Sequence, residues 1–346
     1  MRGDRWSAIC SLECGRTHFV PHSCRNRHCP LCQGQAALLP VPYFHVVFTL
    51  PHGLNPLIGQ NQATLYNLLF GTASQTLVEF GQKRFGVQLG ITAVLHTWSQ
   101  TLLDHYHLHC IVTGGALSAD GSKWVSAPPR FRFAVRALSE VFRGKFCAGL
   151  RQLYARGELR FHGQLEPLAH PGTFAKRLRQ ATQHRWVVYA KRPFAGPRQV
   201  LAYLSRYTHR VAISPRRLLE LDKPARTVGF AWKDYADGGR SKTMTLPLRE
   251  FLRRFCLHLL PERFVKIRHF GFLSNSQRQE RLAQARQLLA PSGQINPAAG
   301  TLPQAEPPAR EATPPAVCPH CGSRQLRLIE IVRPPGRPLP AVIDSS

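Results

Sequence analysis

The sequence has few acidic residues: 19 aspartates and glutamates stand against 46 lysines and arginines, which gives a formal net charge of +27 over 346 residues. A surplus of this size requires a polyanion or an anionic membrane surface as partner. The basic residues are spread along the chain, which suits a broad nucleic-acid surface better than one amphipathic membrane helix. The charge balance therefore predicts a protein that binds nucleic acid.

Long hydrophobic runs are also missing. No stretch of about 18 apolar residues exists, and the N-terminal MRGDRWSAIC lacks the apolar core of a signal peptide. The sequence therefore predicts neither a membrane span nor secretion, and we expect a cytoplasmic protein. Hydrophobic residues still make up 43% of the chain, which is enough for a packed core.

Composition divides the chain into four predicted segments. Residues 1–36 are rich in Cys, His and Arg and predict a small zinc-binding module, and residues 38–290 have the composition of a globular body. Residues 291–316 are rich in Pro and Ala and predict a disordered linker. Residues 317–346 form a short tail that carries Cys318 and Cys321.

The globular body alternates strand-like and helix-like patterns. Apolar and β-branched runs predict strands over residues 42–50, 91–98, 107–113 and 186–190. Helical spacing predicts helices over residues 55–85, 133–156, 173–183, 197–207, 249–260 and 276–289, the first with Asn55 as N-cap. Asp237-Gly238-Gly239 predicts a hairpin turn between strands at 228–235 and 244–248. This mixture predicts an α+β fold, an antiparallel sheet with helices on one side.

Five cysteines near the N-terminus have the spacing of a structural zinc site: Cys10, Cys14, Cys24, Cys29 and Cys32. Tetrahedral zinc needs four such ligands, and a chain segment this short has no other core. The spacing favours four of them as zinc ligands, namely Cys10, Cys14, Cys29 and Cys32. Cys24 is the first alternative ligand. Unliganded cysteines are the competing interpretation, which the clustering disfavours. Arg25 and Arg27 lie between the ligands and are expected to contact DNA phosphates.

A second motif is His107-Leu108-His109 on a predicted strand. Side chains alternate along a strand, so the two imidazoles share one face while Leu108 points to the core. Such a pair can hold a divalent ion when a third ligand is near, and the candidates are His96 and Gln100. The motif is short, and ordinary surface histidines would also produce it.

A third motif is a pair of tyrosines, Tyr203 and Tyr207, one turn apart on a predicted helix. Two neighbouring phenols can serve as alternate nucleophiles. A tyrosine pair that packs on the core has the same spacing, so the pair by itself does not establish catalysis.

Long stretches of the chain resemble the insertion-sequence-91-type transposases, which are two-tyrosine rolling-circle transposases with an N-terminal zinc-binding domain. The resemblance extends over nearly all of residues 10–275. Its most specific stretches are SCRNRHCPLCQG (23–34), AVLHTWSQTLLDHYHLHCIVTGGALS (93–118) and WVVYAKRPFAGPRQVLAYLSRYTHRVAIS (186–214).

The resemblance implies an HUH-endonuclease-like core and a DNA transposase that nicks single-stranded element ends. It assigns His107 and His109 to a catalytic Mg²⁺ or Mn²⁺, and Tyr203 and Tyr207 to a 5′-phosphotyrosine intermediate and strand transfer. Arg206 and Arg210 are expected to contact DNA beside the tyrosines. The implied partner is DNA, with no membrane, in the nucleoid of a bacterium.

The sequence departs from the family pattern at its start. Ser11 stands where the first zinc ligand is expected, with Cys10 one residue early, and the chain begins almost on its cysteines. This departure is compatible with a truncated zinc module or with a decayed copy of the element. Two alternatives stay open: a catalytically inactive, zinc-containing DNA-binding remnant, and a metal-dependent hydrolase without a covalent step.

Overall fold

The computed structural model describes residues 6–11, 14, 17–21, 38–128, 131–194, 212–274, 277–290 and 326–332. The chain divides into two units, residues 39–289 and residues 1–38 together with 290–346. The helix predicted over 197–207, the linker predicted over 291–316 and the tail cysteines lie outside the described residues. Of the described helices, none is long and apolar enough to cross a membrane.

A five-stranded antiparallel sheet forms the centre of the larger unit, in the order β12-β4-β5-β3-β8. Its strands are β3 (Tyr43–Thr49), β4 (Ile91–Trp98), β5 (Asp104–Thr113), β8 (Val188–Phe194) and β12 (Ile267–Phe270). The strand predicted over 91–98 is confirmed, while β5 begins three residues earlier than predicted. Runs such as YFHVVFT form strands because β-branched and aromatic side chains pack well on a pleated surface.

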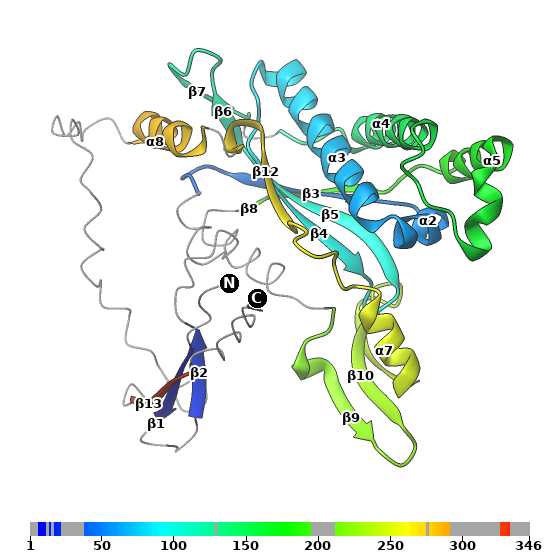
Figure 1. The fold of residues 1–346 in the computed structure, drawn as a ribbon. Coiled ribbons are helices and arrows are strands. Elements are labelled where there is room, and N and C mark those ends of the chain that lie inside the picture. The colour runs from blue at the N-terminus through cyan, green and yellow to red at the C-terminus, as the bar shows by residue number, and fades with distance from the viewer. Residues whose placement is uncertain are drawn as a thin grey trace, which may run out of the picture. The chain divides into compact units, whose positions relative to one another are not determined.

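Helices cover one face of this sheet (Figure 1). They are α2 (Asn55–Gln60), α3 (Gln62–Phe85), α4 (Val135–Ala155) and α5 (Pro171–Thr182), joined by the short helices η1 (His52–Leu54) and η2 (Gly163–Ala169). The fully buried Phe48 of β3 meets Phe142 of α4 with ring centroids 4.9 Å apart, and Leu108 lies on the same covered face. The predicted α+β fold is confirmed.

The single helix predicted over 55–85 is wrong, because the chain breaks at Asn61. The side chain of Asn61 donates to the carbonyl of Arg160 and accepts from its amide, at 3.0 and 2.7 Å. These bonds hold Asn61 outside helical geometry. Asn55 is also not an N-cap: it is the first residue of α2, and its amide donates instead to the carbonyl of Asp104 at 2.9 Å.

A smaller antiparallel sheet adjoins the end of β4. It contains β9 (Leu218–Asp222), β10 (Thr227–Asp234) and β11 (Arg240–Pro247), with η3 (Pro215–Arg217) before it and α7 (Leu248–Cys256) after it. The predicted hairpin turn is confirmed, and Gly238 and Gly239 take φ values of 60° and 79° that favour glycine. Phe230 and Phe251 belong to the hydrophobic core of this smaller sheet, and Trp98 of β4 packs against that core.

The other end of β4 meets a separate group of short elements: β6 (Gly115–Leu117), β7 (Trp124–Ser126), η4 (Gly271–Leu273) and α8 (Arg278–Leu289). Gly271 allows η4 to approach this end, since a Cβ there would lie 1.8 Å from the carbonyl oxygen of Leu89. The short strands β6, β7, β9 and β12 were not predicted.

The second unit contains a three-stranded antiparallel sheet in the order β13-β1-β2. The strands are β1 (Trp6–Ser11), β2 (Thr17–Pro21) and β13 (Leu326–Val332). Ser11 pairs with Leu326 and Trp6 with Val332. A strand from the far end of the chain therefore belongs to the same sheet as the N-terminal module.

Candidate metal centre

Three histidines from two neighbouring strands gather at one end of the central sheet: His96 of β4, and His107 and His109 of β5. The register places His96 opposite His107. The ring centroid of His109 lies 4.4 Å from that of His96 and 4.8 Å from that of His107. One ligand nitrogen from each of the three residues lies within 4.8 Å of the other two. Of the two candidates for a third partner, the structure brings His96 to the pair.

Hydrogen bonds orient two of these rings. The Nδ1 of His107 donates to the carbonyl oxygen of His105 at 2.7 Å, which leaves its Nε2 as the nitrogen with a lone pair. The Nδ1 of His109 lies 2.8 Å from the Nε2 of His45. These two rings are 5° from parallel with centroids 5.1 Å apart, as expected for an in-plane hydrogen bond. When His109 donates, its Nε2 is likewise available to an ion.

Burial keeps His107 and His109 neutral. It lowers the pKa of His107 to about 3 and that of His109 well below its ordinary value, with neighbouring imidazoles adding to both effects. Burial, with a contribution from Lys191, also lowers the pKa of His45 to about 4. Metal binding requires neutral imidazole, so at neutral pH the rings are in the form that binds an ion without losing a proton.

The donor set fits a divalent ion. Three imidazole nitrogens this close can bind one ion and leave further coordination positions for a substrate oxygen and water. Imidazole suits borderline divalent ions, whereas Mg²⁺ prefers oxygen ligands. An ion held here would act as a Lewis acid on a coordinated oxygen atom.

Sequence reasoning missed three residues around the site: His45, Trp98 and Lys266. The ring of Trp98 stacks on His96, with centroids 4.9 Å apart and planes 16° from parallel. The ammonium of Lys266 lies 5.1 Å from the centroid of Trp98, and burial lowers the pKa of Lys266 to about 8. His45 could have been noticed as the single histidine within an otherwise apolar strand.

Most other predicted site residues lie outside the described residues, namely Tyr203, Tyr207, Arg206, Arg210, Arg25, Arg27, Cys24, Cys29 and Cys32. Of the zinc candidates, Cys10 belongs to β1, where it pairs with Arg327 and Thr17. Cys14 is in the turn between β1 and β2 and is half-buried.

Two family models match the chain. Residues 90–281 match the family described as "Putative transposase", and residues 5–50 match the "Transposase zinc-binding domain". "Putative transposase y4qJ" of Sinorhizobium fredii is 46% identical over 292 residues, which cover 81% of this chain and 73% of that protein. The transposase for insertion sequence element IS801 of Pseudomonas savastanoi pv. phaseolicola is 28% identical over 275 residues, covering 76% of this chain and 64% of that protein.

Solved structures offer only a distant likeness. A metal-bound conjugative relaxase TrwC in complex with oriT DNA is 13% identical, covers 71% of this chain and 72% of that chain, and has a TM-score of 0.28. At this TM-score the likeness supports nothing about function. The family match rests on sequence, and it covers more than half of the chain. The chain therefore belongs to the insertion-sequence-91 type of transposases, with the zinc-binding domain of that family at its N-terminus.

Proposed function

We propose that the protein nicks single-stranded ends of a rolling-circle insertion sequence and transfers the strand through a 5′-phosphotyrosine intermediate. The observation that carries the proposal is the assembly of His96, His107 and His109 from two strands into one closely spaced group. The test is a covalent protein–DNA adduct that resists SDS and requires a divalent ion. A protein that lacks a covalent step forms no such adduct.

The three histidines would hold Mg²⁺ or Mn²⁺. The bound ion would supply Lewis-acid polarisation of the scissile phosphate. The carbonyl of His105 and the ring of His45 orient the histidines, and the stack of Trp98 on His96 limits rotation of that ring. The chain thereby holds the ligand set in place before an ion binds.

The proposed nucleophile is the phenol oxygen of Tyr203 or Tyr207. It attacks phosphorus while the bond from phosphorus to the 3′ oxygen breaks, so the protein becomes linked to the 5′ phosphate and a 3′ hydroxyl is released. The phenol proton must leave, and free tyrosine titrates near pH 10, so nearby positive charge is needed. Arg206 and Arg210 are the proposed source of that charge.

The group of three histidines weighs against the alternative of a catalytically inactive, DNA-binding remnant of a transposase. A protein that only binds DNA needs no closely spaced group of three histidines with oriented rings. The net charge of +27 supports a nucleic-acid partner. We propose that this partner is single-stranded DNA, with Arg25 and Arg27 of the zinc module among its phosphate contacts. We place this activity at the bacterial nucleoid.

His45 is expected to act as a positioning residue for the metal site. Replacing His45 with alanine removes the partner of His109 Nδ1, and loss of such a partner typically weakens metal binding about 10- to 100-fold. Mn²⁺ titration followed by electron paramagnetic resonance measures this affinity directly. His45→Gln can present an amide oxygen near the original Nε2 position and should restore much of the binding. Equal Mn²⁺ affinity in wild type and His45→Ala would contradict the role.

The zinc module is expected to lose its structure with its metal. We propose a tetrahedral Zn²⁺ bound by cysteines from the set Cys10, Cys14, Cys24, Cys29 and Cys32. Replacing both Cys29 and Cys32 with serine should lower zinc content by elemental analysis, because metal binding supplies most of the folding energy of such a module. Since β13 pairs with β1, limited proteolysis should then cut at both ends of the chain while residues 39–289 resist. Unchanged zinc content would refute the ligand assignment.

A further inference from the structure

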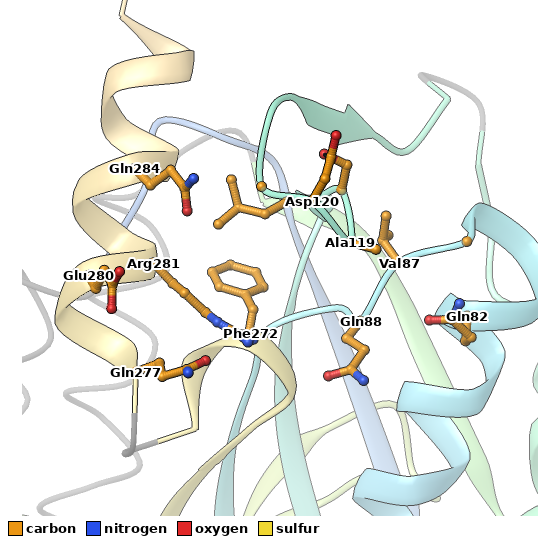
Figure 2. Close-up of a pocket in the computed structure, with 14 residues that line it drawn as sticks. Gln82, Val87, Gln88, Ala119, Asp120, Phe272, Gln277, Glu280, Arg281 and Gln284 are labelled. Carbon is orange, nitrogen blue, oxygen red and sulfur yellow. Dashed lines mark hydrogen bonds between the residues drawn. The ribbon is translucent and has the colours of Figure 1, made fainter.

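A second site lies at the opposite end of β4 from the histidines. It is a pocket of about 360 Å³ between α8, the β6–β7 hairpin and the loop after α3. Its volume is within the range of small-ligand sites. Strands rise about 3.3 Å per residue, so Ile91 at this end lies roughly 16 Å from His96. Figure 2 shows the ring of Phe272 in the middle of the pocket, with the side chain of Arg281 running toward it from α8.

Glutamine amides dominate the polar lining: Gln82, Gln88, Gln277 and Gln284. Within the described parts of the chain, none of these four amides is hydrogen-bonded to another protein group. Each amide can both donate and accept, which is the pattern needed to pair with the edge of a neutral heteroaromatic ring. The pocket thus presents several open amide groups around one aromatic side chain.

The charge of the lining differs from that of the whole chain. The pocket has two carboxylates, Asp120 and Glu280, against the single guanidinium of Arg281, whereas the whole chain is strongly basic. A phosphate site would collect Arg and Lys instead. The carboxylate of Asp120 accepts from the hydroxyls of Ser118 and Ser122 at 2.5 and 2.6 Å, which holds the hairpin turn in shape. The lining therefore suits an uncharged ligand with donors and acceptors along its edge.

We propose that this pocket receives one unpaired nucleobase of the single-stranded DNA on which the histidine site acts. The inference rests on the proposed function, because single-stranded DNA supplies the base. The glutamine amides would pair with the base edge, and the planar group of Arg281 or the ring of Phe272 would contact its face. The distance from the histidines places the recognised base a few nucleotides from the nick. A base at that position would give the enzyme sequence preference without a contact to the scissile phosphate.

The experiment compares two double variants on the same strands. Gln88→Ala with Gln284→Ala removes amides from two walls of the pocket. Gln279→Ala with Gln287→Ala removes two exposed amides of α8 that do not line it. Fluorescence anisotropy measures the affinity of each protein for strands of dA, dC and dT and for an abasic strand of equal length.

Wild type and the control variant should bind at least one base-bearing strand more tightly than the abasic strand. In the pocket variant, the ratio of the affinity for the base-bearing strand to the affinity for the abasic strand should fall about tenfold. Its affinity for the abasic strand should stay unchanged. Its salt dependence should match that of wild type, because no phosphate contact is removed. An unchanged base preference in the pocket variant would overturn the proposal. Adduct formation by wild type tests the proposed function separately, since it depends on the histidines and tyrosines rather than on these glutamines.

Discussion

Replacing both Tyr203 and Tyr207 with phenylalanine should abolish the covalent protein–DNA adduct while leaving the protein folded and able to bind DNA. Phenylalanine keeps the ring and removes only the oxygen. If the tyrosines served packing alone, the change would cost about 1–2 kcal/mol where a buried hydrogen bond is lost. A nucleophile has no such tolerance, because no covalent bond can form without the oxygen. Each single variant should retain part of the activity, since one tyrosine can substitute for the other.

The measurement is a denaturing gel of each variant incubated with a 3′-labelled single-stranded element end and Mn²⁺. The label stays with the fragment whose 5′ phosphate becomes linked to the protein, so an adduct appears as a shifted, SDS-stable band. Tyr189→Phe is the matched control. Tyr189 is half-exposed on β8 and pairs with Val47, which also pairs with His109, so its phenol lies on the histidine face of the sheet. An adduct that persists in the double variant and disappears in Tyr189→Phe would identify Tyr189 as the nucleophile.

Alanine at His107 or His109 should reduce cleavage of single-stranded DNA below detection and leave DNA affinity within a few-fold. Each imidazole is one of the three proposed ligands, and loss of one would leave two nitrogens to hold the ion. Because His109 is buried and His107 half-buried, we expect their removal to change few phosphate contacts. Cleavage with Mg²⁺ and with Mn²⁺, together with Mn²⁺ affinity, measures the effect.

His184→Ala provides the control, since His184 is exposed, follows the end of α5 and belongs to neither β4 nor β5. It should cleave and bind Mn²⁺ as wild type does. His96→Ala should behave like the other two ligand variants. Normal cleavage by His107→Ala or His109→Ala would show that the assembled histidines do not hold the catalytic ion. A loss of cleavage with unchanged Mn²⁺ affinity would place the ion elsewhere.

The sequence determined the features that depend on neighbours along the chain. Strand alternation puts His107 and His109 on one face and Leu108 in the core, because the side-chain period of a strand is two. Asp237-Gly238-Gly239 forms the predicted turn, because glycine accepts positive φ at little cost. The family resemblance rested in the same way on the order of residues in long continuous stretches, and the family models confirm it.

Tertiary structure decided the features that join distant segments. Sequence reasoning proposed both His96 and Gln100 as third partner, and the antiparallel register between β4 and β5 sets His96 opposite His107. His45 became the partner of His109 only through the pairing of β3 with β5. The glutamine pocket likewise combines α3, the β6–β7 hairpin and α8, which are far apart in sequence. Spacing along the chain cannot specify such contacts, because strand order and register are set by the burial of the whole sheet against its helices.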